Sequence, residues 1–421
     1  RLMNKTQKLS LKKVFGNFKN AGDLDYVTGW FLKASKYIIG SKTKVAFVST
    51  NSIVQGLQAN LLWQYLMGFY GIQIHFAHRT FKWSNEAKGN AAVYCIIVGF
   101  ANFNPISRKI FEYEDIKGVP HEIKVKNINQ YLIDSKNIFL QRRQKPISEV
   151  PEMNFGNMPA EGGEFLFTDQ EKNEFVELEP QSIPYFKEYI SAAEFLNGKK
   201  RWCLWLEGIN PSILKELKLV YERVKNVRKI REVSSRPHLA STPHLFAQIT
   251  QPIGDPFILI PRHTSENRVY IPLGYFTGDY IGADSCLIIP NGDLYHFGVL
   301  HSKIHMVWVH AVCGRLESRF RYSKDIVYNN FPWPEIVNQR IRIKIIEAAQ
   351  KILILRDSFK NSTLSDLYDP ITMPFELLEA HQQLDKIVDS AYRASKFNSD
   401  IQRLEFLFDL HEKIVNKDNI L

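Results

Sequence analysis

Near-continuous apolar runs alternate with a helical pattern in the first part of the chain. Val45–Ser49, Ile72–Phe76 and Ala91–Phe100 have the composition of buried strands. Residues 57–67 lie between the first two runs, and their apolar side chains recur at the spacing of one helical face. Sheet-like residues begin at Asp25–Trp30. The strand–helix–strand order predicts an α/β sheet covered on both faces over residues 1–115.

The pattern changes at about residue 116. Up to residue 335 the chain is rich in proline, and short strand-like runs occur at Phe257–Ile260, Val269–Ile271 and Cys286–Ile289. One helix is predicted over Pro211–Arg231, with proline at an early position. This middle region is therefore expected to be a mixed α/β domain with long loops.

Residues 336–421 have a helical pattern. Pro374 could open a helix with one apolar stripe, formed by Leu377, His381, Leu384, Val388 and Ala391. A second helix is expected around Ile401–Leu410. The predicted fold class is α/β plus α+β with a helical C-terminal domain.

Composition excludes some classes of protein and weakly favours one kind of partner. No apolar run is long enough to cross a membrane, and the first residues have no signal-peptide pattern. Cys95, Cys203, Cys286 and Cys313 lie far apart in the sequence, which suits reduced thiols in a cytoplasmic protein. The net charge of +10 favours a polyanionic partner.

The first region lacks one expected feature of a doubly wound enzyme domain. Such a domain has a glycine-rich loop after its first strand, and this sequence contains none. The strands therefore resemble the second half of a domain.

Blocks along nearly the whole chain resemble the MmeI-type restriction–modification family, bacterial fused adenine-N6 DNA methyltransferases with a target-recognition domain. The blocks are Leu24–Ala34, Phe47–Gly56, Ile74–Ala87, Val150–Pro159, Arg201–Leu206, Ser265–Pro272, Phe297–Ser302, Gly314–Ser323, Asn330–Pro334, Ser365–Pro370 and Ala380–His381. The resemblance implies the end of a class I methyltransferase (Rossmann-like) sheet over 1–115, a target-recognition domain over 116–335 and a helical domain over 336–421. It also implies double-stranded DNA as the partner.

The family's nuclease domain, S-adenosylmethionine loop and Asn-Pro-Pro-aromatic motif are not matched. No Asn-Pro-Pro triplet occurs in the sequence. The chain thus resembles the C-terminal portion of such an enzyme. S-adenosylmethionine is expected in the intact enzyme, and none is expected on this chain alone. A missing N-terminal nuclease and methyltransferase half, or a partner subunit, would supply the rest.

Two elements match places where the family acts on bases. Phe81, with Trp83 as second choice, matches the aromatic that stacks on a flipped adenine, although an aromatic at a strand end is also common in cores. Glu317, Arg319 and Arg321 alternate, so one strand would present all three on one face, where Arg suits guanine and Glu suits the cytosine amino group. Arg315 precedes them. The alternative is a solvated charged face.

Other basic residues are candidates for phosphate contacts, which set register without reading sequence. They are Arg142 and Arg143, Arg262 and Arg268, and the helix residues Arg223, Lys225, Arg228 and Arg231. His301, His305 and His310 could suggest a metal, but no nearby carboxylate or Cys completes a ligand set. Asn330–Pro334 is expected to pack.

Three functions remain open at the level of the sequence. The chain could be the DNA-recognition part of a methyltransferase, a non-catalytic specificity subunit for a separate polypeptide, or a degenerate pseudo-enzyme. The coding region upstream of Arg1 would separate the first two.

Overall fold

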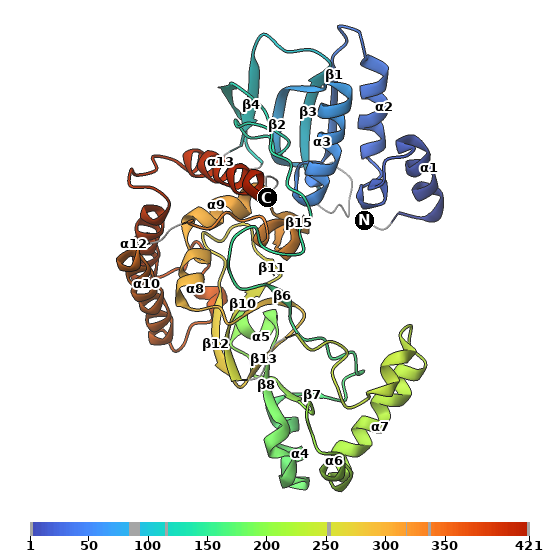
Figure 1. Cartoon of the computed structure of the whole chain (residues 1–421), viewed down its shortest axis with the longest axis vertical. Helices are drawn as coiled ribbons and strands as arrows, with labels where there is room; N and C mark the ends of the chain where they lie inside the picture. Colours follow the sequence, from blue (N-terminus) through green and yellow to red (C-terminus); the bar gives the residue numbers. More distant parts are fainter. Residues whose placement is uncertain are drawn as a thin grey trace. The chain divides into compact units, whose positions relative to one another are not determined.

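The computed structural model describes residues 3–83, 93–113, 117–250, 254–316, 318–335 and 338–418. The chain forms two compact units, each made of separate segments. Unit 1 contains Arg1–Ser148, Val307–Trp333 and Lys396–Leu421, and unit 2 contains Glu149–Met306 and Pro334–Ser395. Figure 1 shows the elements of both units.

Unit 1 is built on one five-stranded sheet with the order β1-β3-β2-β4-β5. The strands are β1 (Val45–Thr50), β2 (Gln73–Trp83), β3 (Val93–Ala101), β4 (Arg108–Glu112) and β5 (His121–Val125). The third strand runs antiparallel to both of its neighbours, whereas β2 and β4 are parallel. A reversed strand therefore lies inside the sheet, and β1 forms one edge.

Helices α2 (Thr28–Ile38) and α3 (Gly56–Tyr70) pack their apolar faces on the inner strand β3 of this sheet. Unit 1 also contains α1 (Lys5–Phe15) and α13 (Asp400–Asp418). The ring of Phe100 on β3 stacks on Phe31 of α2 at 5.7 Å and meets Trp63 of α3 edge-on at 6.4 Å. All three rings are fully buried. Figure 1 shows α2 and α3 side by side along the sheet.

The rest of unit 1 is a short hairpin with its supporting segments. The hairpin consists of β15 (Gly314–Leu316) and β16 (Arg319–Arg321), and α9 (Lys303–Val312) precedes it. The short helical turns are Ala21–Asp23, Asn51–Val54 and the π-turn Lys324–Tyr328. After the hairpin, Asn330, Phe331 and Trp333 are buried, as the expected packing role requires.

Unit 2 holds two four-stranded sheets, with the orders β12-β10-β14-β6 and β13-β8-β9-β7. Its strands are β6 (Asn154–Phe155), β7 (Leu166–Phe167), β8 (Phe186–Ile190), β9 (Trp202–Leu204), β10 (Gly254–Pro261), β11 (His263–Thr264), β12 (Gly274–Gly278), β13 (Tyr280–Gly282) and β14 (Cys286–Pro290). Its helices are α4 (Asp169–Leu178), α5 (Ala192–Asn197), α6 (Pro211–Glu216), α7 (Lys218–Glu232), α8 (Leu294–Leu300), α10 (Gln339–Ser358), α11 (Leu364–Leu367) and α12 (Phe375–Tyr392), with helical turns at Pro180–Tyr185 and Pro237–Ser241.

The predicted fold class is confirmed, and three local predictions need correction. Asp25–Trp30 leads into α2 and is not sheet, because buried side chains recur at 28, 31, 32, 35 and 38 with a helical period. Val269–Ile271 forms no strand. The buried Tyr270 ring there stacks on His381 at 4.2 Å, so the apolar run serves a tertiary contact.

The predicted helix Pro211–Arg231 is two helices, α6 and α7, divided at Leu217. The buried Leu217 side chain anchors the break. The Glu179 carboxylate accepts hydrogen bonds from the backbone N–H groups of Leu219 and Val220 at 3.0 and 3.1 Å. A buried carboxylate therefore caps the start of α7, where N–H groups lack partners within the helix.

None of the helices in the described ranges is both long and apolar enough to cross a bilayer.

Candidate nucleic-acid interface

The β15–β16 hairpin separates its side chains onto two faces. Arg319 and Arg321 are exposed, whereas Phe320 between them is fully buried. This is the period-2 alternation of a strand. Glu317, the third predicted member of the row, lies outside the described residues.

Arg315 has a different environment from Arg319 and Arg321. Residue 315 pairs with Phe320 across the hairpin, and its guanidinium carbon lies 3.9 Å from the centre of the Phe320 ring. Its Nη1 donates a hydrogen bond to the Ser318 carbonyl at 3.0 Å. Arg315 therefore stiffens the hairpin from within.

The start of the hairpin is in backbone contact with α3. Gly56, the first residue of α3, has φ +54°, and a Cβ there would lie 3.0 Å from the Gly314 Cα and 3.3 Å from its nitrogen. These distances are shorter than most real Cβ contacts, so the backbone at Gly314 would have to shift by a few tenths of an ångström. The hairpin is thus seated on the helix that follows β1.

Phe81 and Trp83 lie at the end of β2, next to a β-bulge. His78 pairs with Ile97 and Phe81 with Cys95, so three residues of β2 span two of β3. A bulge of this kind re-aims the side chains that follow it. The Phe81 ring is half-buried and stacks on Tyr113 at 5.3 Å, whereas Trp83 is 50% exposed.

The remaining predicted arginines have contacts within their own units. Arg142 is exposed, with Nε 3.6 Å from an Asp325 carboxylate oxygen. The backbone of Arg143 bonds to Asp325 and Asn329. Arg262 donates to the Asp284 carbonyl, and Arg268 donates to Thr264 and Ser365 hydroxyls at 2.9 and 3.0 Å. Both of these guanidinium groups already satisfy part of their hydrogen-bonding capacity inside unit 2.

One of the phosphate contacts predicted for the basic helix α7 is not possible in the structure. Arg231 is 2% exposed and donates hydrogen bonds to the carbonyl oxygens of Pro159, Ala160, Leu239, Thr242 and Leu245. The prediction that Arg231 contacts phosphate is therefore wrong, because its buried guanidinium donates its hydrogen bonds to backbone carbonyl oxygens. Arg223 lies over the Phe167 ring at 4.4 Å. Lys225 and Arg228 lie on the surface of α7, paired with Glu222 and Glu232.

Of the three predicted histidines, His301 and His305 are buried in unit 2, whereas His310 is exposed in unit 1. The centres of the His310 and Phe320 rings are 4.8 Å apart.

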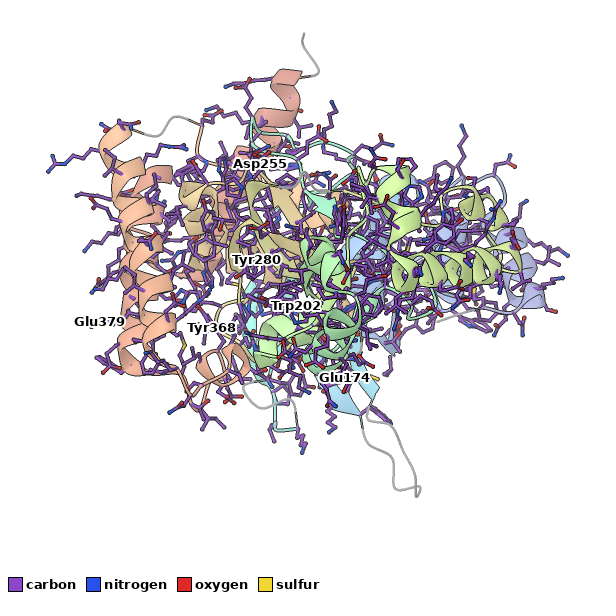
Figure 2. All side chains as sticks on the ribbon, turned by 90° about the horizontal axis from the view of Figure 1, so that it is seen from below. Glu174, Trp202, Asp255, Tyr280, Tyr368 and Glu379 are labelled. Carbon is purple, nitrogen blue, oxygen red and sulfur yellow. The ribbon has the colours of Figure 1, made fainter. Side chains whose placement is uncertain are left out.

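His301 belongs to a buried polar network in unit 2. Nη2 of Arg356 on α10 lies 3.0 Å from His301 Nε2, and its Nη1 donates to the Leu273 carbonyl at 2.6 Å. The Arg356 Nε donates to the Tyr368 hydroxyl, which lies 2.9 Å from His381 Nε2. Tyr368 is labelled in Figure 2 on the inner side of the helices, and Glu379 on their exposed side.

Burial and the Arg356 charge hold the pKa of His301 and His381 well below the ordinary value, so both rings are neutral at pH 7. His305 Nδ1 lies 2.6 Å from the Leu300 carbonyl. Within the described ranges, no three His, Cys, Asp or Glu side chains form a group that could hold a metal ion. The contacts of Arg356 with His301 and Leu273 could not be inferred from the sequence, since they join residues more than fifty positions apart.

Comparison with known proteins agrees with the geometry. Three family profiles match in sequence order: "MmeI, DNA-methyltransferase domain" at residues 1–112, "MmeI, target recognition domain" at 134–335 and "MmeI, C-terminal domain" at 337–418. The chain is therefore composed of MmeI-type methyltransferase, target recognition and C-terminal domains.

Two relatives are similar over almost the whole chain. "DNA methyltransferase A" of Bacillus subtilis (strain 168) is 42% identical over 420 residues, which are 98% of this chain and 46% of that protein. The solved structure of the Type IIL restriction–modification enzyme MmeI in complex with DNA is 46% identical, with a TM-score of 0.90, covering 98% of this chain and 55% of that one. The chain thus spans about half the length of these relatives.

Proposed function

We propose that this chain is the sequence-recognition portion of an S-adenosylmethionine-dependent adenine-N6 DNA methyltransferase of a restriction–modification system. The observation that carries the proposal is the β15–β16 hairpin, whose buried Phe320 directs Arg319 and Arg321 to one exposed face. Side chains on one exposed strand face can reach base edges in the major groove of DNA, where Arg binds the O6 and N7 atoms of guanine with two hydrogen bonds. Double-stranded DNA is the partner in this proposal.

Phe81 has a separate role in the proposal. Methylation of adenine inside a duplex requires the base to leave the stack, and an aromatic ring lowers the cost of holding it outside. The half-buried Phe81 ring at the end of β2 is available for this contact, and the exposed Trp83 is the second candidate.

No Gly-x-Gly sequence and no Asn-Pro-Pro triplet occurs among the 421 residues. In this proposal, S-adenosylmethionine and the adenine amino group are therefore held by residues outside this sequence, and the chain supplies base reading and support of the flipped base.

Substitution of Arg319 tests base reading. In the full-length protein, Arg319→Ala should relax the recognition sequence at one base pair, with a loss of about 1–3 kcal/mol of discrimination there. Methylation of a randomised duplex library, followed by sequencing of methylated sites, measures this change. Arg340→Ala, at an exposed position at the start of α10, is the control and should leave the sequence unchanged. An unchanged recognition sequence in Arg319→Ala would refute base reading by this residue.

A further inference from the structure

The end of β2 carries an aromatic arrangement that extends beyond Phe81. We propose that Tyr113 is a positioning residue for the flipped base: it holds the Phe81 ring in the orientation that stacks on the target adenine. This inference rests on the proposed function of Phe81.

The first observation is the stack itself. The Phe81 and Tyr113 ring centres are 5.3 Å apart, with an angle of 28° between the ring planes. Tyr113 comes from the segment directly after β4, so the two rings approach from different strands. The Trp83 ring also lies near Phe81, at 6.3 Å, but it is tilted by 52°, so Tyr113 is the ring that stacks on Phe81. Such a stack fixes the orientation of the Phe81 ring before a planar ligand arrives.

The second observation is what fixes Tyr113. Its hydroxyl lies 2.9 Å from Nδ1 of His78, and the His78 ring stacks on Phe111 at 4.2 Å with an angle of 8°. Burial lowers the pKa of His78 and raises the pKa of Tyr113, so both groups are neutral at pH 7. Next to this pair, Arg79 and Glu112 form an ion pair between the ends of β2 and β4.

The third observation is the bulge in β2. In a regular strand, residues 78 and 81 would point to opposite faces of the sheet, because their separation is odd. The extra residue between the His78–Ile97 and Phe81–Cys95 pairs shifts the alternation. As a result both His78 and Phe81 contact Tyr113. The bulge therefore places Phe81 on the face where Tyr113 can support it.

The chemistry of the ligand follows from the arrangement. A stacking face backed by a second aromatic ring suits a planar, neutral heterocycle, and base–aromatic stacking does not depend on hydrogen-bonding edges. The Phe81–Tyr113 pair would therefore contribute to holding the base outside the duplex. It would contribute nothing to the choice among flanking base pairs.

The experiment uses the full-length protein with two cognate duplexes. One has 2-aminopurine at the target position and reports base flipping by fluorescence, and the other has adenine there and reports methylation. Tyr113→Ala should lower the fluorescence increase on binding and reduce kcat for methylation about tenfold or more, while KM and the Kd for the duplex change less than about threefold. Tyr113→Phe keeps the ring but loses the hydroxyl contact to His78, so its kcat should lie between those of the unsubstituted enzyme and Tyr113→Ala. A mismatch opposite the target adenine should restore most of the activity of Tyr113→Ala, because the base is then easier to extrude.

Two control variants, Phe103→Ala and Phe81→Ala, distinguish a loss of packing, an error about Tyr113 and an error about Phe81. Phe103→Ala removes an aromatic contact to His75, near the other end of β2, and should leave kcat unchanged if loss of packing alone is harmless. If Phe81→Ala is impaired and Tyr113→Ala is not, the positioning role of Tyr113 is wrong and the role of Phe81 stands. If neither variant is impaired, the stacking role proposed for Phe81 is wrong as well. If Tyr113→Phe loses as much activity as Tyr113→Ala, ring support is not what Tyr113 provides.

Discussion

The Asp385 carboxyl on α12 is 9% exposed and accepts two hydrogen bonds, from the Tyr270 hydroxyl at 2.7 Å and from the Lys303 backbone N–H at 2.6 Å. Burial raises its pKa from the ordinary 3.8 to about 6, although both donors act in the opposite direction. The His381 ring stacks on Tyr270, and Asp389 lies one turn further along the helix. This carboxyl thus joins the C-terminal helices to the start of α9, at a cost in desolvation.

Because its pKa is raised, the Asp385 carboxyl stabilises the folded chain more at low pH than at neutral pH. A carboxyl that binds its proton more tightly in the folded state favours folding below the unfolded pKa of 3.8, and this contribution is lost as the pH rises through about 6. In Asp385→Asn the titrating carboxyl group is replaced by an amide that does not ionise. The unfolding free energy of the unsubstituted chain should therefore fall by about 2 kcal/mol relative to Asp385→Asn between pH 4 and pH 7.

Urea unfolding of both chains at several pH values measures this difference. His301 and His381 are present in both proteins, so their own titration cancels in the comparison. A difference that stays constant with pH would show that Asp385 has no raised pKa in the folded state.

Several residue roles were invisible in the sequence. Arg231 belongs to a basic run and resembles a phosphate ligand in the sequence, but its guanidinium binds five carbonyl oxygens from two segments, 159–160 and 239–245. Tyr113 has no local signal because its contacts depend on the pairing of β2 with β4. In contrast, the exposed face of Arg319 and Arg321 followed from alternation alone, since period 2 holds for any strand.

At the scale of elements, α3 has glycine at both ends, and these two glycines can be compared. Gly56 and Gly71 both have positive φ, at +54° and +63°. A Cβ at Gly56 would meet backbone of the hairpin, whereas a Cβ at Gly71 would lie 3.3 Å from the Asn102 side chain. Each substitution by Ala strains φ by about 1–2 kcal/mol, and only the first displaces the hairpin.

Gly56→Ala and Gly71→Ala should therefore differ in DNA recognition and resemble each other in stability. We expect similar losses in Tm, together with a fall of about tenfold or more in the ratio of cognate to non-cognate affinity for Gly56→Ala only. Thermal unfolding and competition binding with the full-length protein measure the two effects. Equal affinity ratios in the two variants would contradict a positioning role of the Gly56–Gly314 contact.

Helices and strands whose apolar residues repeat at a regular spacing were predictable from the sequence, and the other elements were not. The strands β10 and β14 and the helices α3 and α12 have long apolar runs or stripes, and the structure places them where the pattern indicated. The strand β1 also forms at its predicted place, but it is an edge strand with Val48 53% exposed, so the prediction of a buried strand is wrong there. The start of α2 and the residues before it have a strand-like composition in Tyr26, Val27 and Trp30, and only the buried positions further along the helix show the helical period. The break at Leu217 depends on capping by Glu179, a residue about forty positions away.

At the scale of the whole chain, segments that are distant in the sequence belong to the compact unit that contains the five-stranded sheet. Residues 307–333 and 396–421 belong to the same compact unit as residues 1–148. Lys136 forms ion pairs with Asp409 at 2.6 Å and Glu412 at 2.5 Å, and the Tyr131 ring stacks near Phe408. Such long-range contacts leave no periodic pattern in the sequence. Sequence analysis therefore predicts domains as continuous stretches and misses units that are built from separate segments.

This arrangement places the hairpin in the same unit as the sheet that carries Phe81. In the proposed function, base reading and base flipping are therefore parts of one compact body. The net charge of +10 adds attraction for DNA that does not depend on sequence. Any test of recognition must therefore suppress binding to phosphates alone.

The most direct test of the central claim is selection of duplexes from a randomised pool by this 421-residue chain, at about 0.15 M salt. Arg319→Ala is selected in parallel. If the chain reads DNA through the hairpin, one short asymmetric site containing adenine is enriched, and the variant enriches the same site with one position relaxed. Recovery of unselected DNA, or of the same fully defined site by both proteins, would contradict recognition by the β15–β16 hairpin.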